Sequence, residues 1–438
     1  MKLSERMAFY RVPGVSIAVI HEGKLEWAKG YGVLEAKGSN TVTTETLFQA
    51  ASISKPVTAM ASLALVEQGK LSLDENVNSK LTSWHLPDNE FTKSEKVTLR
   101  RILSHSAGLT VGGFPGYAAN EAVPTLAQVL DGQKPKVNTP PIRVDILPGK
   151  RVRYSGGGYA VTQQLLIDVT GKPFPDLLQE LVLGKIGMTH STFAQPLPKE
   201  LESIAATGHR DNGEPVNGRW YRYPELAAAG LWTTPSDLAL FVIELMKSAQ
   251  GKSSKVLSPK MARQMVTKEL GTYGLGIAVG DAQGVTKFSH EGGNQGFRCV
   301  LVGYVETGQG AVVMTNSDSG PGLFNEILRG IAQEYNWKDN RPRERTTALV
   351  DAATLVSYSG QYDADGIPIA ISLQSGRLSI KAEPLGPAPL TLEPSSEDRF
   401  YALESDDFEV HFVKDKQGSV SELQIQAGTA QARAKRVK

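Results

Sequence analysis

A serine and a lysine three residues apart, Ser52 and Lys55, are the first residues that could carry out a reaction. On a helix this spacing puts both side chains on one face, so that the amine can reach the hydroxyl. A buried lysine with a depressed pKa is neutral near pH 7 and can take the serine proton, which makes the serine a nucleophile. The spacing is common in proteins, so an ordinary exposed helix start is the alternative.

A tyrosine followed by a serine and three glycines, Tyr154 to Gly158, forms the second group. Successive glycines allow backbone conformations that other residues avoid, and this run ends where a helix is expected to begin. The segment could present Tyr154 to a cleft, or it could be a tight structural turn. A phosphate-binding loop is disfavoured, because the glycine spacing matches neither the Walker motif nor the dinucleotide-binding motif.

The third group is the sequence His-Glu-Gly-Gly at residues 290–293, which precedes an apolar run that begins at Arg298. Glycines at a strand edge let a substrate backbone approach closely. A histidine there could polarise a bound carbonyl or take part in a proton relay, and a satisfied loop histidine is the alternative for His290. Arg298 could bind a substrate carboxylate, unless it is a strand-end arginine that faces water.

These groups are far apart in the sequence, so the fold must bring them together. Strand-like apolar runs lie at both ends of residues 1–340, and the region between them, from about Ser52 to Glu269, is mostly helical. We therefore expect a sheet made from both ends with helices inserted between. The predicted strands are residues 15–20, 25–32, 273–279, 298–304 and 311–315, and the predicted helices include residues 57–65, 160–169, 238–246 and 323–337.

The pattern changes after residue 340, where a polar, charged and proline-broken stretch is typical of a linker. We assign the linker to residues 341–348. Short alternating strands separated by turn residues follow, which predicts a small all-β barrel or sandwich at residues 349–438. The strands expected there are residues 369–373, 377–380, 408–413 and 420–425.

The composition excludes several classes of protein. The 438 residues include 47 Lys or Arg and 46 Asp or Glu, for a net charge of +1, which disfavours a globally basic nucleic-acid-binding protein. A single cysteine, Cys299, excludes an internal disulfide framework and a cysteine-based zinc site. No run of about 18 apolar residues could span a membrane. The first residues lack the apolar segment of a signal peptide, so we expect a cytoplasmic protein, or a periplasmic or secreted one if an export signal was removed.

In this order, the three groups resemble the motif set of penicillin-recognising serine enzymes. The sequence is similar to the β-lactamase-related serine hydrolases, which include class C β-lactamases, D-alanyl-D-alanine carboxypeptidases, D-aminopeptidases and esterases. The resemblance covers about residues 8–335 and includes the stretch 98–109, in which His105 is expected to be structural. It implies an α/β fold, an α+β sandwich of the β-lactamase and transpeptidase type, with an antiparallel sheet flanked by helices. The C-terminal part resembles the lipocalin-like barrel that some of these hydrolases carry.

The resemblance also implies roles for individual residues. Ser52 would be the acyl-accepting nucleophile. Lys55 and Tyr154 would share the general-base role and protonate the leaving group. His290 would be the catalytic residue of the third group, residues 290–293. The backbone N–H groups of Ser52 and Gly293 would form the oxyanion hole.

Two positions depart from the family pattern. Gly156 replaces the usual Asn that would bind the amide of an acyl side chain. The sequence His290-Glu291-Gly292 replaces Lys-Thr-Gly. Both changes argue against an efficient β-lactamase, although weak activity on β-lactams is still expected. We assign substrate contacts to Gly156, Gly292 and Arg298.

We therefore expect a serine hydrolase that forms an acyl-enzyme on Ser52 and needs no metal or cofactor. Its substrates would be small carboxylic esters, amides of D-amino-acid peptides, or β-lactams. A D-stereospecific peptidase or transpeptidase is one alternative. Another is a penicillin-binding receptor that is acylated without turnover. The sequence is also compatible with self-association into a homo-oligomer.

Overall fold

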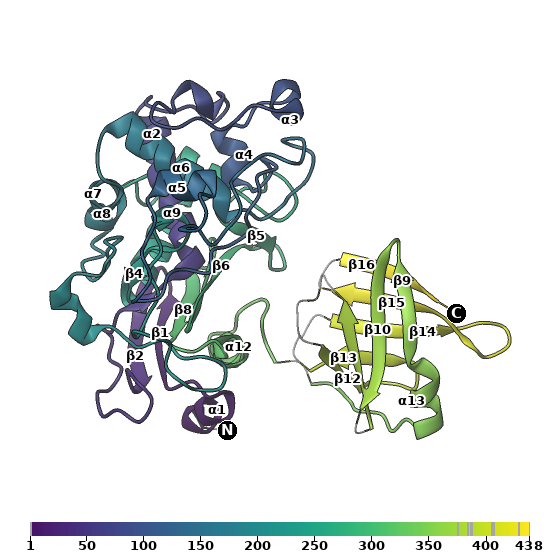
Figure 1. The fold of residues 1–438 in the computed structure, drawn as a ribbon. Helices are drawn as coiled ribbons and strands as arrows, with labels where there is room; N and C mark the ends of the chain where they lie inside the picture. Colours follow the sequence, from purple (N-terminus) through teal and green to yellow (C-terminus); the bar gives the residue numbers. More distant parts are fainter. Residues whose placement is uncertain are drawn as a thin grey trace. The chain divides into compact units, whose positions relative to one another are not determined.

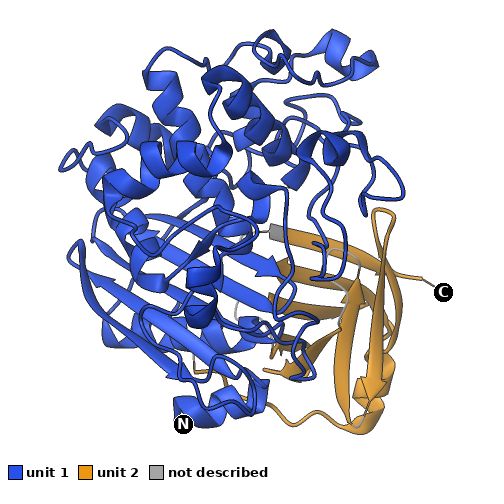
Figure 2. Cartoon of the chain, turned by 60° about the vertical axis from the view of Figure 1, so that its left-hand side comes forward, with its two compact units in different colours: residues 1–341 blue, residues 342–438 orange. Residues whose placement is uncertain are grey.

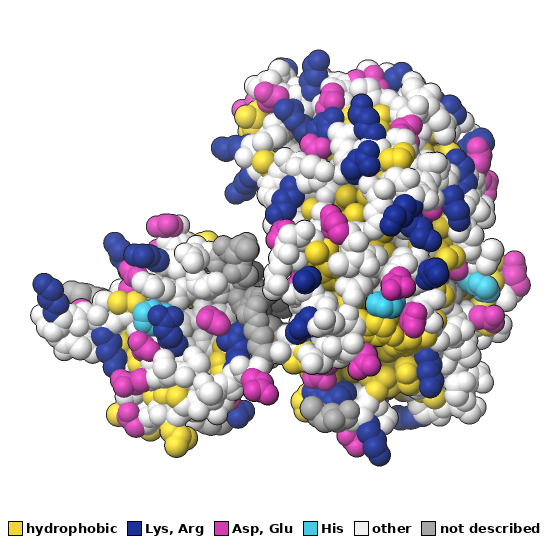
Figure 3. Space-filling view, turned by 180° about the vertical axis from the view of Figure 1, so that it is seen from behind, with side chains coloured by type: hydrophobic (Ala, Val, Ile, Leu, Met, Phe, Trp, Pro, Cys, Tyr) yellow, Lys and Arg dark blue, Asp and Glu magenta, His cyan; other side chains and the backbone are white. Residues whose placement is uncertain are grey.

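A computed structural model describes residues 2–342, 344–374, 376–382, 385, 389–403, 408–427 and 430–437. The chain divides into two compact units, Met1–Arg341 and Pro342–Lys438, which are coloured separately in Figure 2. The boundary falls at the start of the stretch that we assigned as a linker. Charged side chains of both signs are interspersed on the face shown in Figure 3, in keeping with the net charge of +1.

The first unit is built on a six-stranded antiparallel sheet with the strand order β2-β1-β8-β7-β6-β5 (Figure 1). Because β1 pairs with both β2 and β8, the two ends of this unit meet at the middle of one sheet, which confirms the predicted fold. The strands predicted at residues 15–20 and 25–32 are also confirmed, and they pair as an antiparallel hairpin. The strands are β1 (Gly14–His21), β2 (Lys24–Gly32), β5 (Ala278–Asp281), β6 (Thr286–Asn294), β7 (Phe297–Tyr304) and β8 (Gln309–Thr315).

Both faces of the sheet are covered, which explains why the central strands are apolar almost throughout. On β1, Val15, Ile17 and Val19 pack in a cluster with side chains of helices α1 (Leu3–Tyr10) and α12 (Gly320–Glu334). Ala18 and Ile20 point the other way and join the larger core beneath the helical region. The alternation follows from the two-residue period of a strand.

The helices between β2 and β5 form the layer that carries the first two motifs (Figure 1). Their starts follow local capping rules. At α10, the Thr234 hydroxyl accepts a hydrogen bond from the N–H of Asp237, and Pro235 occupies the first turn. The α-helices of the first unit are α1 (Leu3–Tyr10), α2 (Ser54–Glu67), α3 (Glu90–Ser94), α4 (Leu99–Leu103), α5 (Leu126–Asp131), α6 (Gly156–Thr170), α7 (Phe174–Leu178), α8 (Gly184–Ile186), α9 (Leu226–Ala229), α10 (Pro235–Ala249), α11 (Pro259–Met265) and α12 (Gly320–Glu334). A two-stranded sheet joins β3 (Phe48–Gln49) to β4 (Trp232–Thr233).

The predicted strand at residues 273–279 is wrong for most of its length, because β5 begins only at Ala278. The apolar residues before it belong to a turn. Gly276 has a φ of 93°, and its N–H donates to the carbonyl of Leu103. An added Cβ there would lie 2.2 Å from the Cβ of Ala59, so the turn packs directly on α2. An apolar run buried under a helix has the same composition as a buried strand, and composition alone cannot separate the two.

The second unit begins with α13 (Ala352–Tyr358) and continues as a closed eight-stranded antiparallel barrel in the order β10-β11-β12-β13-β14-β15-β16-β9. All four strands predicted here are confirmed, and the architecture is a barrel rather than a sandwich. Closure removes the free strand edges that would otherwise pair with other chains. The strands are β9 (Gly360–Ala364), β10 (Ile367–Gln374), β11 (Arg377–Ala382), β12 (Leu390–Pro394), β13 (Arg399–Ala402), β14 (Phe408–Lys414), β15 (Val420–Ala427) and β16 (Ala430–Arg436).

Candidate active site

Ser52 lies in a 3₁₀ turn, Ala51–Ile53, that leads directly into α2. Ala51 has a φ of 49°, in the left-handed region that non-glycine residues seldom adopt. The hydroxyl of Ser54 stabilises this conformation by donating to the Ala51 carbonyl (2.6 Å) and accepting from the N–H of Leu231 (3.0 Å). The strained turn therefore holds Ser52 in a fixed position before the helix.

Lys55 occupies the first turn of α2, and its amine reaches the hydroxyl of Ser52 as the spacing predicts. The Nζ atom is 2.9 Å from Oγ of Ser52 and 2.9 Å from the carbonyl oxygen of Ala228. Burial lowers the pKa of Lys55 to about 7. No carboxylate forms an ion pair with it in the part of the chain that the structure describes. A substantial fraction of the amine is thus unprotonated at neutral pH.

Tyr154 approaches the same point from the loop before α6, where Ser155 caps the helix by accepting from the N–H of Gly158 (3.0 Å). The ring of Tyr154 lies 5.0 Å from Nζ of Lys55. Burial raises the pKa of Tyr154 to about 12, and the neighbouring hydroxyl of Ser52 partly offsets this effect. The phenol therefore keeps its proton at neutral pH and is suited to donate it.

His290 lies on β6, with its ring centroid 6.2 Å from that of Tyr154. Its Nδ1 atom donates to the carbonyl of Glu291 (2.7 Å), which leaves Nε2 as the unprotonated nitrogen of the neutral ring. This Nε2 atom is buried and has no hydrogen-bond partner among the described residues. Burial and the nearby amine of Lys55 lower the pKa of His290 to about 3. His290 is therefore a neutral acceptor at the place where the usual motif Lys-Thr-Gly has a lysine.

His105, expected to be structural, contacts the ring of Tyr154 directly. Its ring centroid is 4.3 Å from that of Tyr154 and 4.8 Å from that of Tyr273, and its Nδ1 atom accepts from the N–H of Ser155 (3.1 Å). Burial lowers the pKa of His105 well below its ordinary value, so the ring is neutral. His105 thus holds the loop that presents Tyr154.

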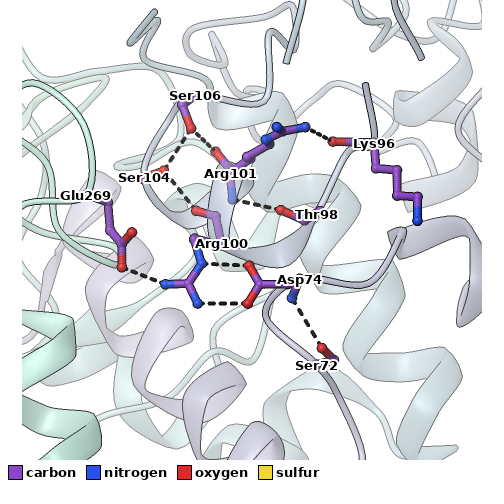
Figure 4. Close-up of polar contacts among 9 residues, drawn as sticks. All are labelled: Ser72, Asp74, Lys96, Thr98, Arg100, Arg101, Ser104, Ser106 and Glu269. Carbon is purple, nitrogen blue, oxygen red and sulfur yellow. Dashed lines mark hydrogen bonds and ion pairs between the residues drawn. The ribbon is translucent and has the colours of Figure 1, made fainter. Parts of the chain in front are cut away.

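An ion-pair network supports the segment that carries His105 (Figure 4). Arg100 binds Asp74 through two hydrogen bonds of 2.7 and 2.9 Å, and it contacts Glu269 at 2.7 Å. Further along the segment, the hydroxyl groups of Ser104 and Ser106 lie 2.9 Å apart. Arg100 therefore connects α4 to two loops that are distant in the sequence.

A pocket of about 490 Å³ opens over these groups. Six of the eight predicted site residues line it: Ser52, Tyr154, His290, Gly292, Gly293 and Arg298. Lys55 is buried behind Ser52 and is not part of the lining. Gly156 is not part of the lining, because it lies buried at the start of α6. The complete lining is Ser52, Tyr154, Tyr273, Ala278, Ser289, His290, Glu291, Gly292, Gly293, Arg298, Pro321 and Phe324.

Because Gly292 has no side chain, β6 can pack closely against the turn that contains Ser52. A Cβ added at this position would lie 2.2 Å from the carbonyl oxygen of Ala50 and 2.5 Å from Sγ of Cys299. At Gly293 an added Cβ would meet nothing closer than Arg298 at 3.4 Å. Asn294 fixes the end of the strand by donating to the carbonyl of Ala229 (3.1 Å). The two backbone segments expected to form the oxyanion hole are thus packed against each other.

The guanidinium of Arg298 is occupied by other protein groups. It forms an ion pair of 2.8 Å with Asp318 and donates to the carbonyls of Asn294 and Phe297. Asp318 also accepts from the N–H of Gly296 (3.0 Å). Arg298 lines the pocket, but these bonds make it a support for the turn between β6 and β7.

Sequence reasoning missed several residues of the pocket and its support. Tyr273, Pro321 and Phe324 line the pocket, and the carbonyl oxygen of Ala228 binds Lys55. The resemblance could have directed attention to His105, which lies in one of the shared stretches. The carbonyl oxygen of Ala228 could not have been predicted, because every residue has a main-chain oxygen and the residue type does not show which one binds Lys55.

A serine in hydrogen-bond contact with a buried lysine and close to a tyrosine, beside an antiparallel sheet covered by helices, is the arrangement expected of the penicillin-recognising serine hydrolases. The chain belongs to the Beta-lactamase family, whose model matches residues 2–335. None of the helices in the described part of the chain is long and apolar enough to cross a membrane.

Two of the curated relatives that the chain resembles are named penicillin-binding proteins. The chain is 27% identical over 345 residues to penicillin-binding protein 4 of Amycolatopsis lactamdurans, covering 74% of this chain and 86% of the relative. It is 23% identical over 433 residues to penicillin-binding protein 4* of Bacillus subtilis, covering 93% and 91% of the two chains. The second similarity extends through both units.

Solved structures share the fold. The octameric penicillin-binding protein homologue from Pyrococcus abyssi matches with a TM-score of 0.65 and 22% identity, covering 99% of this chain and 98% of the other. The D-amino acid amidase from Ochrobactrum anthropi matches with a TM-score of 0.58 and 22% identity, covering 72% and 88%. At these identities the comparisons establish the fold alone.

Proposed function

We propose that the protein hydrolyses carboxylic esters or amides of small acyl or D-amino-acid substrates through a covalent acyl-enzyme on Ser52. The observation that carries this proposal is the contact of 2.9 Å between the Lys55 amine and the Ser52 hydroxyl, at a lysine whose pKa burial lowers to about 7. A neutral amine at this distance is a competent general base.

The reaction follows from these positions in two halves. Oγ of Ser52 attacks the carbonyl carbon while its proton passes to Nζ of Lys55, and the N–H groups of Ser52 and Gly293 stabilise the oxyanion. The bond to the leaving group then breaks as that group receives a proton from Lys55, either directly or through Tyr154, which regains its proton from Lys55. In the second half, water attacks the acyl carbon and gives a proton to Lys55. The bond from the acyl carbon to Oγ then breaks, the acid leaves, and Lys55 returns the proton to Oγ of Ser52.

Esters are favoured over peptide amides in this proposal. Gly156 supplies no side-chain amide to bind an acylamino group, and it lies outside the pocket lining. The neutral His290 also provides no fixed positive charge for a β-lactam carboxylate, so we expect only weak β-lactamase activity. The names of the curated relatives support a second candidate, a penicillin-binding protein that is acylated at Ser52 with little turnover.

Parallel kinetics on three substrates test the proposal. We expect p-nitrophenyl butyrate to be turned over faster than D-alanine p-nitroanilide and nitrocefin, and the Ser52→Ala variant to lose all three activities while remaining folded. Dominant anilide turnover would instead indicate a D-stereospecific peptidase. Stoichiometric labelling by a fluorescent penicillin without turnover would indicate the receptor.

A further inference from the structure

Glu291 lies in the wall of the pocket that contains Ser52. It stands on β6 between the buried residues His290 and Gly292 but is itself exposed. Because side chains alternate along a strand, its carboxylate points to the opposite face from His290, the same face as Gly293. A bound substrate could therefore reach the carboxylate.

The carboxylate of Glu291 has no hydrogen bond or ion pair within the described ranges of the chain. The other formally charged side chain of the lining, Arg298, is already paired with Asp318 and two carbonyl oxygens. His290 is neutral, since burial lowers its pKa to about 3. Burial raises the pKa of Glu291 above its ordinary value, and a bound cation would favour the ionised form, so the unpaired carboxylate of Glu291 is the charge that the pocket lining offers to a cationic ligand.

The geometry of β6 determines how far the carboxylate of Glu291 lies from the N–H of Gly293, where the oxyanion is expected to bind. Glu291 precedes Gly293 by two residues on the same face, which corresponds to roughly 6.6 Å along β6. A substrate with its carbonyl oxygen at the N–H of Gly293 would place a group a few bonds from the scissile bond over Glu291. Pro321 and Phe324 add apolar surface to the same pocket, suited to the hydrocarbon part of such a substrate.

We infer that Glu291 is a specificity-determining residue that binds an ammonium group of the substrate close to the scissile bond. This inference rests on the proposed hydrolysis at Ser52 and narrows its substrate class to cationic acyl compounds. The same carboxylate would repel substrates with a carboxylate at that place, such as β-lactams and peptides with a free C-terminus. Loss of Glu291 would change the choice among substrates and leave the chemistry of the Ser52 site intact.

Two isosteric esters provide the test. In the p-nitrophenyl esters of 4-(trimethylammonio)butyrate and 5,5-dimethylhexanoate, a positively charged nitrogen replaces a carbon atom and the shape is retained. We expect the native enzyme to prefer the cationic ester by at least about tenfold in kcat/KM. Glu291→Gln should lower this ratio at least about fivefold with little effect on the neutral ester. The control Glu26→Gln, at an exposed residue on β2, should keep the native ratio.

An unchanged ratio in Glu291→Gln, or an equal loss on both esters, would overturn the inference. Binding of the two corresponding primary amides to the Ser52→Ala variant, measured by calorimetry, gives the same comparison without turnover. If neither ester is hydrolysed but the cationic amide binds more tightly, and only with Glu291 present, the proposed hydrolysis fails while the role of Glu291 stands. Equal binding of the two amides would overturn that role.

Discussion

Lys55 donates a hydrogen bond of 2.9 Å to the main-chain oxygen of Ala228, a residue 173 positions further along the chain. A carbonyl oxygen can only accept, so one hydrogen of the amine is committed to Ala228. In the neutral amine the lone pair is then free to face the Ser52 hydroxyl, at 2.9 Å. Short helix α9 thus orients the base as well as helping to bury it.

The pH dependence of activity should report the titration of Lys55. Burial lowers the pKa of Lys55 to about 7, and only the neutral amine can take the serine proton. We expect kcat/KM for a neutral ester to rise with pH through a midpoint near 7. His290, whose pKa burial lowers to about 3, adds no inflection in this range. A rate that rises only above pH 9 would show that Lys55 is an ordinary charged lysine.

Stability should also rise with pH because of Lys55. Between about pH 7 and 10.5 the unfolded chain holds a proton that the native amine has lost, so the free energy of unfolding increases by roughly 1.4 kcal/mol per pH unit over that range. Lys55→Met has no such group. Urea unfolding of both proteins at pH 7, 8 and 9 should show a difference that grows with pH. A constant difference would contradict the depressed pKa.

Glu225 should have the opposite effect in a lower pH range. Its carboxyl is buried, neither oxygen has a hydrogen-bond partner among the described residues, and burial raises its pKa to about 8. From about pH 4.5 to 8 the native state holds a proton that the unfolded chain has lost, so stability falls as the pH rises. Glu225→Gln, which imitates the protonated acid, should gain stability relative to the native protein between pH 5 and 8. If the free energies of unfolding of the two proteins changed in parallel between pH 5 and 8, the carboxyl of Glu225 would not be protonated in the native state.

A methyl group at Gly292 should disable the site, whereas one at Gly293 should be tolerated. At Gly292 it would collide with the carbonyl of Ala50 and push β6 away from the Ser52 turn. A displacement of about 1 Å can reduce the rate about 100-fold. Gly293→Ala has room for the methyl and keeps its N–H, so most activity should remain. Circular dichroism of both variants checks that they fold, and equal activities would disprove the close approach of the strand to this turn.

Local patterns predicted the parts of the molecule that depend on near neighbours in the sequence. The hairpin of β1 and β2, the helix after Ser52 and the three motif groups all follow from short spacings. The ion pair of Arg298 with Asp318 and the packing of His105 on Tyr154 depend on tertiary contacts that no spacing encodes. Sequence alternation also identified only half of the barrel strands, and three of the others, β9, β12 and β13, have only four or five residues in which to show a pattern.

The central claim is that Ser52 becomes covalently acylated with Lys55 as its base. Rapid mixing with a slowly released ester, acid quenching and intact-mass analysis would detect the acyl-enzyme, and peptide mapping would locate it. We predict one acyl group per chain on Ser52, formed far more slowly in Lys55→Ala and not formed in Ser52→Ala. An adduct on another residue, or substrate turnover that persists in Ser52→Ala, would contradict this claim.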